Sequence, residues 1–261
     1  MEIIIQPDIE LAGDLIAQEI VRLFNEKPTA VLGLATGSTP LPTYRALRRR
    51  FEAGEVSFSQ GTAFILDEYV GLPEGHPESY RTVIRTELTD YLDFPPEGLH
   101  VPDVYAEDVH AAAAAYEQEI KDSGGVDLQL LGIGENGHIG FNEPGASLVS
   151  RTRVEDLTPS TRRANARFFG GDYDAVPPRC VTQGLGTIME ARHLVLIATG
   201  PRKARAVAQL VEGAVSSRWP ATSLQFHPHA TLLVDEAAAA VLELGDYYRE
   251  SYGEIPSWRS I

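Results

Sequence analysis

The segment 130–145, LLGIGENGHIGFNEPG, carries an imidazole and a carboxylate five positions apart, His138 and Glu143. Glycines at positions 132, 134, 137 and 140 keep side-chain bulk away from them, so a ligand can approach the backbone closely. Pro144 favours an extended conformation at Glu143 over a helical one. A histidine and an acid on an open loop after an apolar strand are typical of acid–base chemistry in α/β enzymes.

The same segment spells G-x-G-x-x-G at positions 132, 134 and 137, the spacing of a dinucleotide-binding loop. That loop needs its third glycine to open a helix. Here Gly140 and then Pro144 interrupt any helix within about two turns. We therefore predict that the chain does not bind a nicotinamide cofactor.

The segment ATGSTP, residues 35–40, has donors suited to phosphate. We expect Thr39 to cap the following helix and Pro40 to occupy its first position. Thr36, Gly37 and Ser38 would then present backbone and hydroxyl donors at the positive end of that helix. An ordinary helix cap explains the segment equally well.

Two adjacent acids, Asp67 and Glu68, end an apolar strand in LDEYVGL, residues 66–72. Neighbouring residues of an extended segment point in opposite directions, so we expect only one of them to face a shared cleft. Taken alone, a strand-end aspartate is more often a capping or ion-paired acid than a catalytic one.

The formal net charge of −15 argues against a general nucleic-acid surface. An anionic substrate must therefore be held by locally clustered basic groups. Arg202, Lys203 and Arg205 crowd the first turn of a predicted helix, where positive charge opposes the helix dipole. A bound anion would resolve that conflict, and a solvated basic turn is the alternative. Three further candidates for phosphate contacts lie in the segment 158–180: Arg162, Arg163 and Arg167.

The elements that must position these groups follow from hydrophobic periodicity. Apolar runs predict strands at residues 30–35, 62–66, 126–132, 193–198 and 230–234. Amphipathic spacing predicts helices at residues 9–25, 41–53, 79–88, 108–121, 203–212 and 235–244. This alternation favours a Rossmann-like α/β fold, a mostly parallel sheet with helices on both faces. Its ligands would bind beyond the carboxyl ends of the strands.

The 261 residues fit a single α/β domain spanning 1–261. The polar, basic segment 158–180 lacks a clear element and is interpreted as a lid. One cysteine, Cys180, excludes an internal disulfide and agrees with a reducing compartment. The N-terminus is a poor secretory signal, and no apolar run reaches the ~18 residues of a bilayer span. We expect a cytoplasmic enzyme without membrane or nucleic-acid partners.

Together these segments resemble the glucosamine-6-phosphate deaminases, also called glucosamine-6-phosphate isomerases. The likeness covers nearly the whole chain, in GLATGSTP, ILDEYVGLPEGHPESY, LGIGENGHIGFNEPG, TRRANARFF, TQGLGTIMEARH and SSRWPATSLQFHPHAT. FNEP after GHIGF separates the chain from the related phosphogluconolactonases. The resemblance implies conversion of glucosamine 6-phosphate and water to fructose 6-phosphate and ammonium, with no metal or organic cofactor.

The resemblance also implies roles for individual residues. Asp67 would be the base that moves a proton from C2 to C1. His138 would assist opening of the sugar ring, and Glu143 would orient it. The phosphate would be held by six residues: Thr36, Gly37, Ser38, Thr39, Arg167 and Lys203.

The chain departs from well-known members of that family at two positions. Asn136 replaces an aspartate before the Gly-His pair, so charge no longer favours a protonated imidazole from that side. We expect His138 to be less readily protonated than in those members, yet active because Glu143 remains. Glu155 replaces a lysine near Arg153 in the site where relatives bind N-acetylglucosamine 6-phosphate. We expect weak or absent activation by that effector, because like charge near a phosphate is unfavourable.

Two alternatives accompany this interpretation. A lactonase acting on a phosphorylated sugar acid would share the phosphate seat and the histidine but would not need Asp67 as a carbon-acid base. A sugar-phosphate sensor would need a DNA-binding module, for which the sequence offers no basic N-terminal helix-turn-helix. A monomer and a closed oligomer both fit the sequence.

Overall fold

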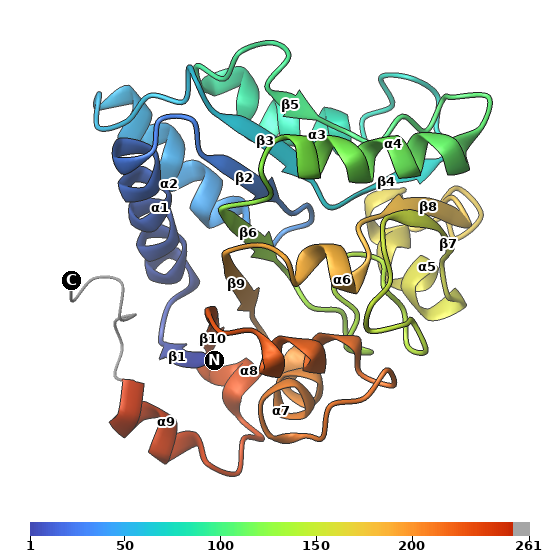
Figure 1. Cartoon of the computed structure of the whole chain (residues 1–261). Coiled ribbons are helices and arrows are strands. Elements are labelled where there is room, and N and C mark those ends of the chain that lie inside the picture. Colours follow the sequence, from blue (N-terminus) through green and yellow to red (C-terminus); the bar gives the residue numbers. More distant parts are fainter. Residues whose placement is uncertain (253–261) are drawn as a thin grey trace.

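Parallel strands form the central sheet of the computed structural model, which describes residues 1–252 (Figure 1). Their spatial order is β1 (Glu2–Gln6), β10 (Ala230–Asp235), β9 (His193–Ala198), β6 (Leu128–Leu131), β2 (Val31–Leu34), β3 (Thr62–Ile65) and β5 (Leu99–His100). The chain moves outward from β2 through β3 to β5, then crosses to β6 and moves the other way through β9 to β10. The strand order therefore reverses between β2 and β6, which is where a doubly wound sheet opens a crevice for ligands.

The helices lie on both faces of this sheet, as the sequence predicts. They are α1 (Ile9–Glu26), α2 (Leu41–Glu52), α3 (Tyr80–Glu87), α4 (Val109–Asp122), α5 (Pro159–Asn165), α6 (Leu185–Ile188), α7 (Ala204–Glu212), α8 (Glu236–Ala239) and α9 (Gly245–Tyr252). Short 3-10 turns are η1 (Thr89–Tyr91), η2 (Ala166–Phe168), η3 (Pro201–Lys203) and η4 (Pro220–Phe226). In Figure 1, α1 and α2 pack side by side on one face, and α4 lies toward the other.

Local sequence explains the longest helix. The Asp8 carboxylate accepts a hydrogen bond of 2.9 Å from the backbone N–H of Glu10 and caps α1. Buried residues recur with helical spacing along α1, among them Leu15, Ile16 and Ile20. The helix ends at Glu26, and Pro28 disfavours a helical conformation at the residue before it.

The five predicted strands and the first four predicted helices are confirmed, with boundaries shifted by at most a few residues. The predicted helix 203–212 begins as the 3-10 turn η3 and continues as α7. The helix predicted at 235–244 is wrong in extent, because α8 ends at Ala239 and a separate helix starts at Gly245. Its run of alanines gave helical spacing without enough apolar bulk to hold a longer helix on the core.

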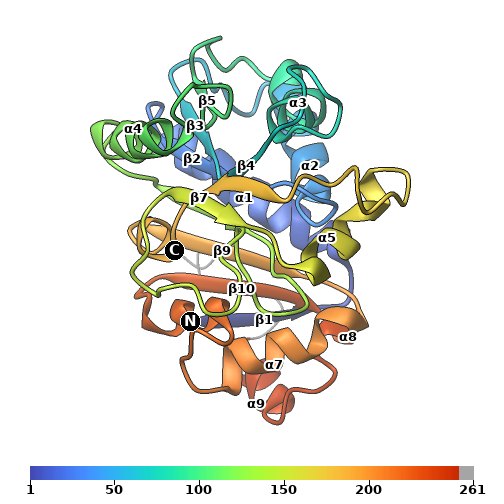
Figure 2. The same ribbon diagram turned by 90° about the vertical axis from the view of Figure 1, so that its right-hand side faces the viewer.

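A second, antiparallel sheet was not predicted. It has the order β4 (Asp67–Val70), β8 (Arg179–Thr182) and β7 (Arg153–Asp156). Figure 2 shows β7 crossing in front of the parallel strands. Mixed polar composition hides these short strands from a search for apolar runs.

The segment 158–180 is more regular than the sequence analysis expected. It contains α5 and η2, and its last two residues already belong to β8. Thr158 caps α5 by accepting a hydrogen bond from the N–H of Thr161, and Pro159 occupies the first helical position. Among the described residues, none of the helices has the length and apolar character needed to cross a membrane.

Candidate active site

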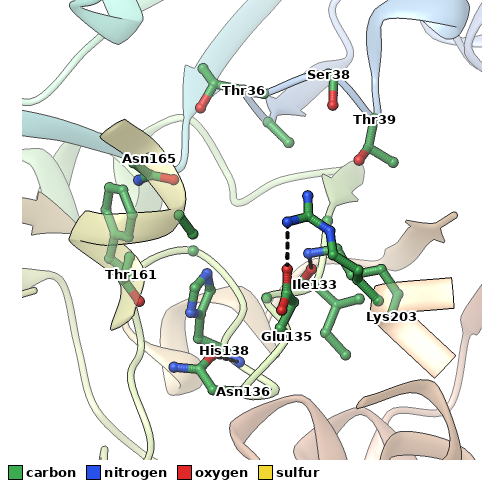
Figure 3. A pocket seen from close by; sticks show the side chains of 18 of the residues that line it. Thr36, Ser38, Thr39, Ile133, Glu135, Asn136, His138, Thr161, Asn165 and Lys203 are labelled. Atoms are coloured by element: carbon green, nitrogen blue, oxygen red, sulfur yellow. Dashed lines mark hydrogen bonds and ion pairs between the residues drawn. The ribbon is translucent and has the colours of Figure 1, made fainter. Parts of the chain in front are cut away.

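A pocket of about 440 Å³ opens at the carboxyl ends of the parallel strands, beside the reversal point between β2 and β6. The loops that follow β2, β3, β6 and β9 all contribute to its wall, and so does the segment α5–η2. Four sequence segments far apart in the chain therefore meet where the sequence analysis expected them to meet. Figure 3 shows the pocket from close by.

The loop after β2 forms one wall with Thr36, Gly37, Ser38 and Thr39. Gly37 has a positive φ of 89°, a conformation that glycine adopts without steric cost. The predicted cap is wrong: Pro40 is the N-cap of α2, and no side chain caps that helix. The hydroxyl of Thr39 is thus not used as a helix cap, and the threonine instead lines the pocket (Figure 3).

Asp67 and Glu68 point in different directions, as their extended conformation predicts. Asp67 lines the pocket, whereas Glu68 does not. The Glu68 carboxylate accepts hydrogen bonds from the backbone N–H groups of Tyr69 at 2.8 Å, Tyr80 at 2.9 Å and Arg81 at 2.9 Å. Glu68 therefore holds the start of α3, which leaves Asp67 as the acid that faces a ligand.

Asp67 is buried, with 6% of its surface exposed. Among residues 1–252 its carboxyl group makes no hydrogen bond, and Oδ2 would lie 3.5 Å from a Cβ added at Gly140. Burial, and then the charge of Glu68, raise the pKa of Asp67 well above its ordinary value of 3.8. A carboxyl group in that environment can accept and return a proton near neutral pH.

His138 and Glu143 face each other across the loop after β6. His138 Nδ1 lies 3.5 Å from Glu143 Oε2, at the outer limit of a hydrogen bond. The other carboxylate oxygen, Oε1, accepts a hydrogen bond of 3.1 Å from the hydroxyl of Thr158. Burial alone would raise the pKa of Glu143, but the bond and charge of His138 outweigh it, together with Thr161 and Asn136, and lower it to about 2. Glu143 is therefore an anion that orients the imidazole.

Asn136 contacts the acid rather than the imidazole ring. Its Nδ2 donates a hydrogen bond of 2.7 Å to Glu143 Oε2, and its Oδ1 accepts one of 3.3 Å from the backbone N–H of His138. Among the described residues the amide makes no hydrogen bond to the imidazole ring, so Asn136 acts on the ring through Glu143 and through the backbone of His138.

Gly134 supports the histidine in a way the glycine pattern only suggested. A Cβ added at Gly134 would lie 2.4 Å from His138 Cε1, so the imidazole packs against the bare backbone there. Gly137, with φ of 86°, has the ring of Trp219 against it in the same manner. Both positions require glycine, because an aromatic ring packs directly against the backbone at each of them.

Of the predicted basic residues, Arg167, Lys203 and Arg202 line the pocket. Lys203 Nζ donates a hydrogen bond of 2.6 Å to the carbonyl of Ile133, and burial lowers the pKa of this lysine. Arg202 Nη1 lies 3.3 Å from the carboxylate of Glu135.

The other predicted arginines do not line the pocket. Arg162 donates to the carbonyls of Tyr173 and Val176 and packs over the Tyr173 ring. Arg205 packs over Trp219. Arg163 is exposed and has no partner among the described residues. The prediction that Arg162, Arg163 and Arg205 contact the phosphate is therefore wrong.

Two pocket residues, Tyr80 and Asn165, were not predicted from the sequence. Asn165 Nδ2 donates a hydrogen bond of 2.8 Å to the hydroxyl of Tyr69, and the Tyr80 hydroxyl donates one of 3.2 Å to the same oxygen. These bonds connect the segment α5–η2 to β4 and α3. The motif that contains Asp67, ILDEYVGLPEGHPESY, ends in Tyr80, and its membership of that motif could have indicated Tyr80 as a pocket residue.

One pocket is thus lined by a buried carboxyl group, by His138 and by groups that can donate hydrogen bonds to an anion. Glu143 does not line the pocket itself and contacts its contents only through His138. A family profile described as glucosamine-6-phosphate isomerases/6-phosphogluconolactonase matches residues 9–233. The chain belongs to this family. No group of three or more histidine, cysteine or acidic side chains among residues 1–252 is arranged to hold a metal ion.

Similar proteins of this family cover the chain from end to end. A glucosamine-6-phosphate deaminase from Mycolicibacterium smegmatis is 61% identical over 261 residues, and one from Streptomyces coelicolor is 55% identical over 261 residues. Each alignment covers 100% of this chain and 100% of the relative.

Solved structures agree with the fold. A monomeric glucosamine-6-phosphate deaminase matches with a TM-score of 0.90 and 41% identity, over 92% of this chain and 100% of that one. A 6-phosphogluconolactonase from Trypanosoma cruzi matches with a TM-score of 0.73 and 21% identity, over 93% of this chain and 97% of that one. The second likeness concerns the fold alone.

Proposed function

We propose that this protein is a glucosamine-6-phosphate deaminase, an enzyme that converts glucosamine 6-phosphate and water to fructose 6-phosphate and ammonium. The observation that carries the proposal is that Asp67 and His138 line one pocket, with the Glu143 carboxylate 3.5 Å from Nδ1 of that histidine. The full-length relatives support it, because deaminases at 61% and 55% identity cover the whole chain.

The reaction begins with opening of the sugar ring. His138 would move a proton between the C1 hydroxyl and the ring oxygen, which an imidazole can do near neutral pH. Glu143 is ionised and faces Nδ1, so it would stabilise the proton on the imidazole and fix the orientation of the ring. Asn136 holds Glu143 in place.

Asp67 would then take the proton from C2 of the open chain. The electrons of that C–H bond form a C1–C2 double bond while the π electrons of the C1 carbonyl move to O1. O1 takes up the proton that the substrate's C2 ammonium group releases, which gives an enolamine. Return of the proton from Asp67 to C1 moves the double bond to C2–N, and water then hydrolyses this imine to the ketone and ammonium. The buried carboxyl group suits both transfers, because its raised pKa lets it hold the proton between them.

Thr36, Gly37, Ser38 and Thr39 would hold the phosphate together with two cations, Arg167 and Lys203. Contacts remote from the reacting carbons fix the position of C1 and C2 over Asp67. The segment 158–180 would act as a lid that excludes water from the enolamine. Its bond from Asn165 to Tyr69 gives it a point of attachment near Asp67.

The wider biochemical setting belongs to the same proposal. We place the enzyme in the cytoplasm as one domain spanning residues 1–261, acting on a small amino sugar phosphate without a cofactor or a metal. Residues of a single chain line the pocket, so the reaction fits a monomer, the state of one solved relative, as well as a closed oligomer.

A coupled assay tests the proposal directly. Purified protein is supplied with glucosamine 6-phosphate as the only sugar, and fructose 6-phosphate and ammonium are measured together. We expect equal amounts of the two products. Hydrolysis of 6-phosphogluconolactone without ammonium release from the amino sugar would identify a lactonase instead, and binding of the amino sugar phosphate without turnover would identify a sensor.

A further inference from the structure

An exposed ion pair lies at the mouth of the pocket. Glu135 follows β6 and Arg202 follows β9, and both line the pocket. Arg202 Nη1 lies 3.3 Å from Glu135 Oε1, and the two side chains are 65% and 47% exposed. Figure 3 draws this contact as a dashed line that ends on Glu135. An ion pair this exposed to solvent contributes little to the free energy of unfolding, so the fold does not require it.

The surroundings of this pair are basic. Lys203 is the next residue along the chain, and Arg167 reaches the same pocket from η2. Burial has the largest effect on the pKa of Lys203 and lowers it; the charge of Glu135 raises it, and those of Arg167 and Arg202 lower it. The four charged groups therefore act on one another. Glu135 supplies the anionic charge beside three cations.

We propose that Arg202 is a further phosphate ligand of this enzyme and that Glu135 occupies its guanidinium group until the phosphate binds. The inference deepens the proposed function, on which it rests. A guanidinium group that donates to a carboxylate can present the same N–H donors to phosphate oxygens. Substrate phosphate would displace the carboxylate of Glu135, which solvent at the mouth can then hydrate.

The exchange makes Glu135 the residue that sets the affinity for phosphate. The free energy needed to break the Arg202–Glu135 ion pair reduces the free energy that phosphate gains by binding Arg202. The negative charge of Glu135 also repels the phosphate. Removing Glu135 should therefore strengthen phosphate binding, whereas removing Arg202 should weaken it. If the ion pair had only a structural role, neither substitution would change the affinity for phosphate.

Calorimetric titration with inorganic phosphate measures the two effects in the full chain. We expect Glu135→Gln to lower the Kd by about two- to fivefold, the range of an exposed ion pair. We expect Arg202→Gln to raise the Kd by about three- to tenfold, through loss of a charged hydrogen-bond donor. In the double variant the effect of Glu135→Gln on the Kd should be smaller, because the Arg202 guanidinium group that this substitution would release is absent.

Glu26→Gln is the matched control. Glu26 forms an exposed ion pair with Arg22 at the end of α1, and it does not line the pocket. Its replacement changes net charge by the same amount, so phosphate affinity should stay at the value of the parent protein. Equal affinities of the Glu135→Gln and Glu26→Gln variants would overturn the inference. So would an unchanged Kd in Arg202→Gln, or a full gain from Glu135→Gln in the double variant.

Turnover separates this inference from the proposed function. A parent protein that releases no ammonium from glucosamine 6-phosphate refutes the proposed function, whatever its phosphate affinity. The titrations with inorganic phosphate then still decide whether Arg202 and Glu135 compete as described. With turnover present, the KM of the two single variants should follow their Kd for phosphate in direction.

Discussion

Asn136 donates a hydrogen bond of 2.7 Å to Glu143, and the accepting oxygen is the one that lies 3.5 Å from the ring of His138. The amide therefore acts on the histidine through the carboxylate. An N–H group that donates to the carboxyl group favours its ionised form, and this bond is one of the causes that lower the pKa of Glu143 to about 2.

Replacing Asn136 by aspartate should change how activity depends on pH. The aspartate would lose the N–H donor to Glu143 and add negative charge next to the carboxylate that faces the imidazole. Added negative charge favours the protonated ring, so we expect the acidic limb of kcat/KM to move up by about one pH unit. Asp67 is present in both enzymes, so the difference reports on the coupled pair of His138 and Glu143. Asn25→Asp, at the far end of α1, is the control for the same chemical change. An unchanged limb in Asn136→Asp would reject the idea.

Asp67→Asn should abolish proton transfer between the carbons. We expect kcat to fall by about 10²- to 10⁴-fold, the usual contribution of a positioned base. The affinity for inorganic phosphate should stay unchanged, since the fold and the anion donors remain.

The neighbouring acid gives the contrast. Glu68→Gln loses part of the acceptor capacity used by Tyr69, Tyr80 and Arg81, so it should lower the free energy of unfolding by about 1–3 kcal/mol. It should keep most of its turnover at a temperature where it is folded. Comparable losses of kcat in both variants would contradict the separate roles of the two acids.

Gly134→Ala should displace the imidazole of His138. The new Cβ would lie 2.4 Å from His138 Cε1, so the ring must move. A displacement of about 1 Å at a reacting group costs on the order of 10²-fold in rate. Gly245→Ala, at the start of α9, is the control, because its added Cβ meets nothing nearer than 3.3 Å, and that neighbour is the end of the flexible side chain of Arg249. A Gly134→Ala enzyme with parental kcat would show that the ring position is not critical.

His193 should make the fold sensitive to acid. Burial, and then the charges of His229, His227 and Arg22, lower its pKa from 6.5 to about 3, although Glu19 lies 4.0 Å from Nδ1. The unfolded chain binds this proton near pH 6.5 and the folded chain does not, so stability is lost as pH falls from 6.5 toward 3. The loss is at most about 1.4 kcal/mol per pH unit.

Urea unfolding at pH 7 and pH 4.5 measures that loss. His193→Gln should narrow the difference between the two free energies of unfolding. His110→Gln, an exposed position at the start of α4, should leave the difference as it is in the parent protein. An equal pH dependence in His193→Gln and the parent would show that other groups govern acid unfolding.

N-acetylglucosamine 6-phosphate should activate this enzyme weakly or not at all. The guanidinium group of Arg153 is in contact with the carboxylate of Glu155, and it also donates a hydrogen bond of 3.0 Å to Asn142 Oδ1. Unlike Arg202, whose side chain is 65% exposed, Arg153 is only 27% exposed, and a phosphate would have to replace both Glu155 and Asn142 to bind it, so it is a poor site for a second phosphate. Saturation by substrate should be hyperbolic, and a large drop in half-saturating substrate concentration on adding the effector would contradict the prediction.

Patterns between near neighbours were sufficient for much of the fold. Apolar runs located the five predicted strands of the parallel sheet, and the alternation of strands with amphipathic helices predicted the α/β class. The opposite directions of Asp67 and Glu68 followed from extended geometry, and the motifs around them indicated the family. Each of these inferences needs only residues within about one element of each other, where backbone geometry fixes the periodicity.

Tertiary structure decided which groups meet. The sheet of β4, β8 and β7 joins segments more than 20 residues apart, and its short polar strands have no periodic signal of their own. Asn136 bonded to Glu143 rather than to the ring, Arg162 turned to Tyr173, and Arg202 paired with Glu135. Such choices depend on the path of distant segments, since a side chain can bond only to a partner that the fold brings within reach.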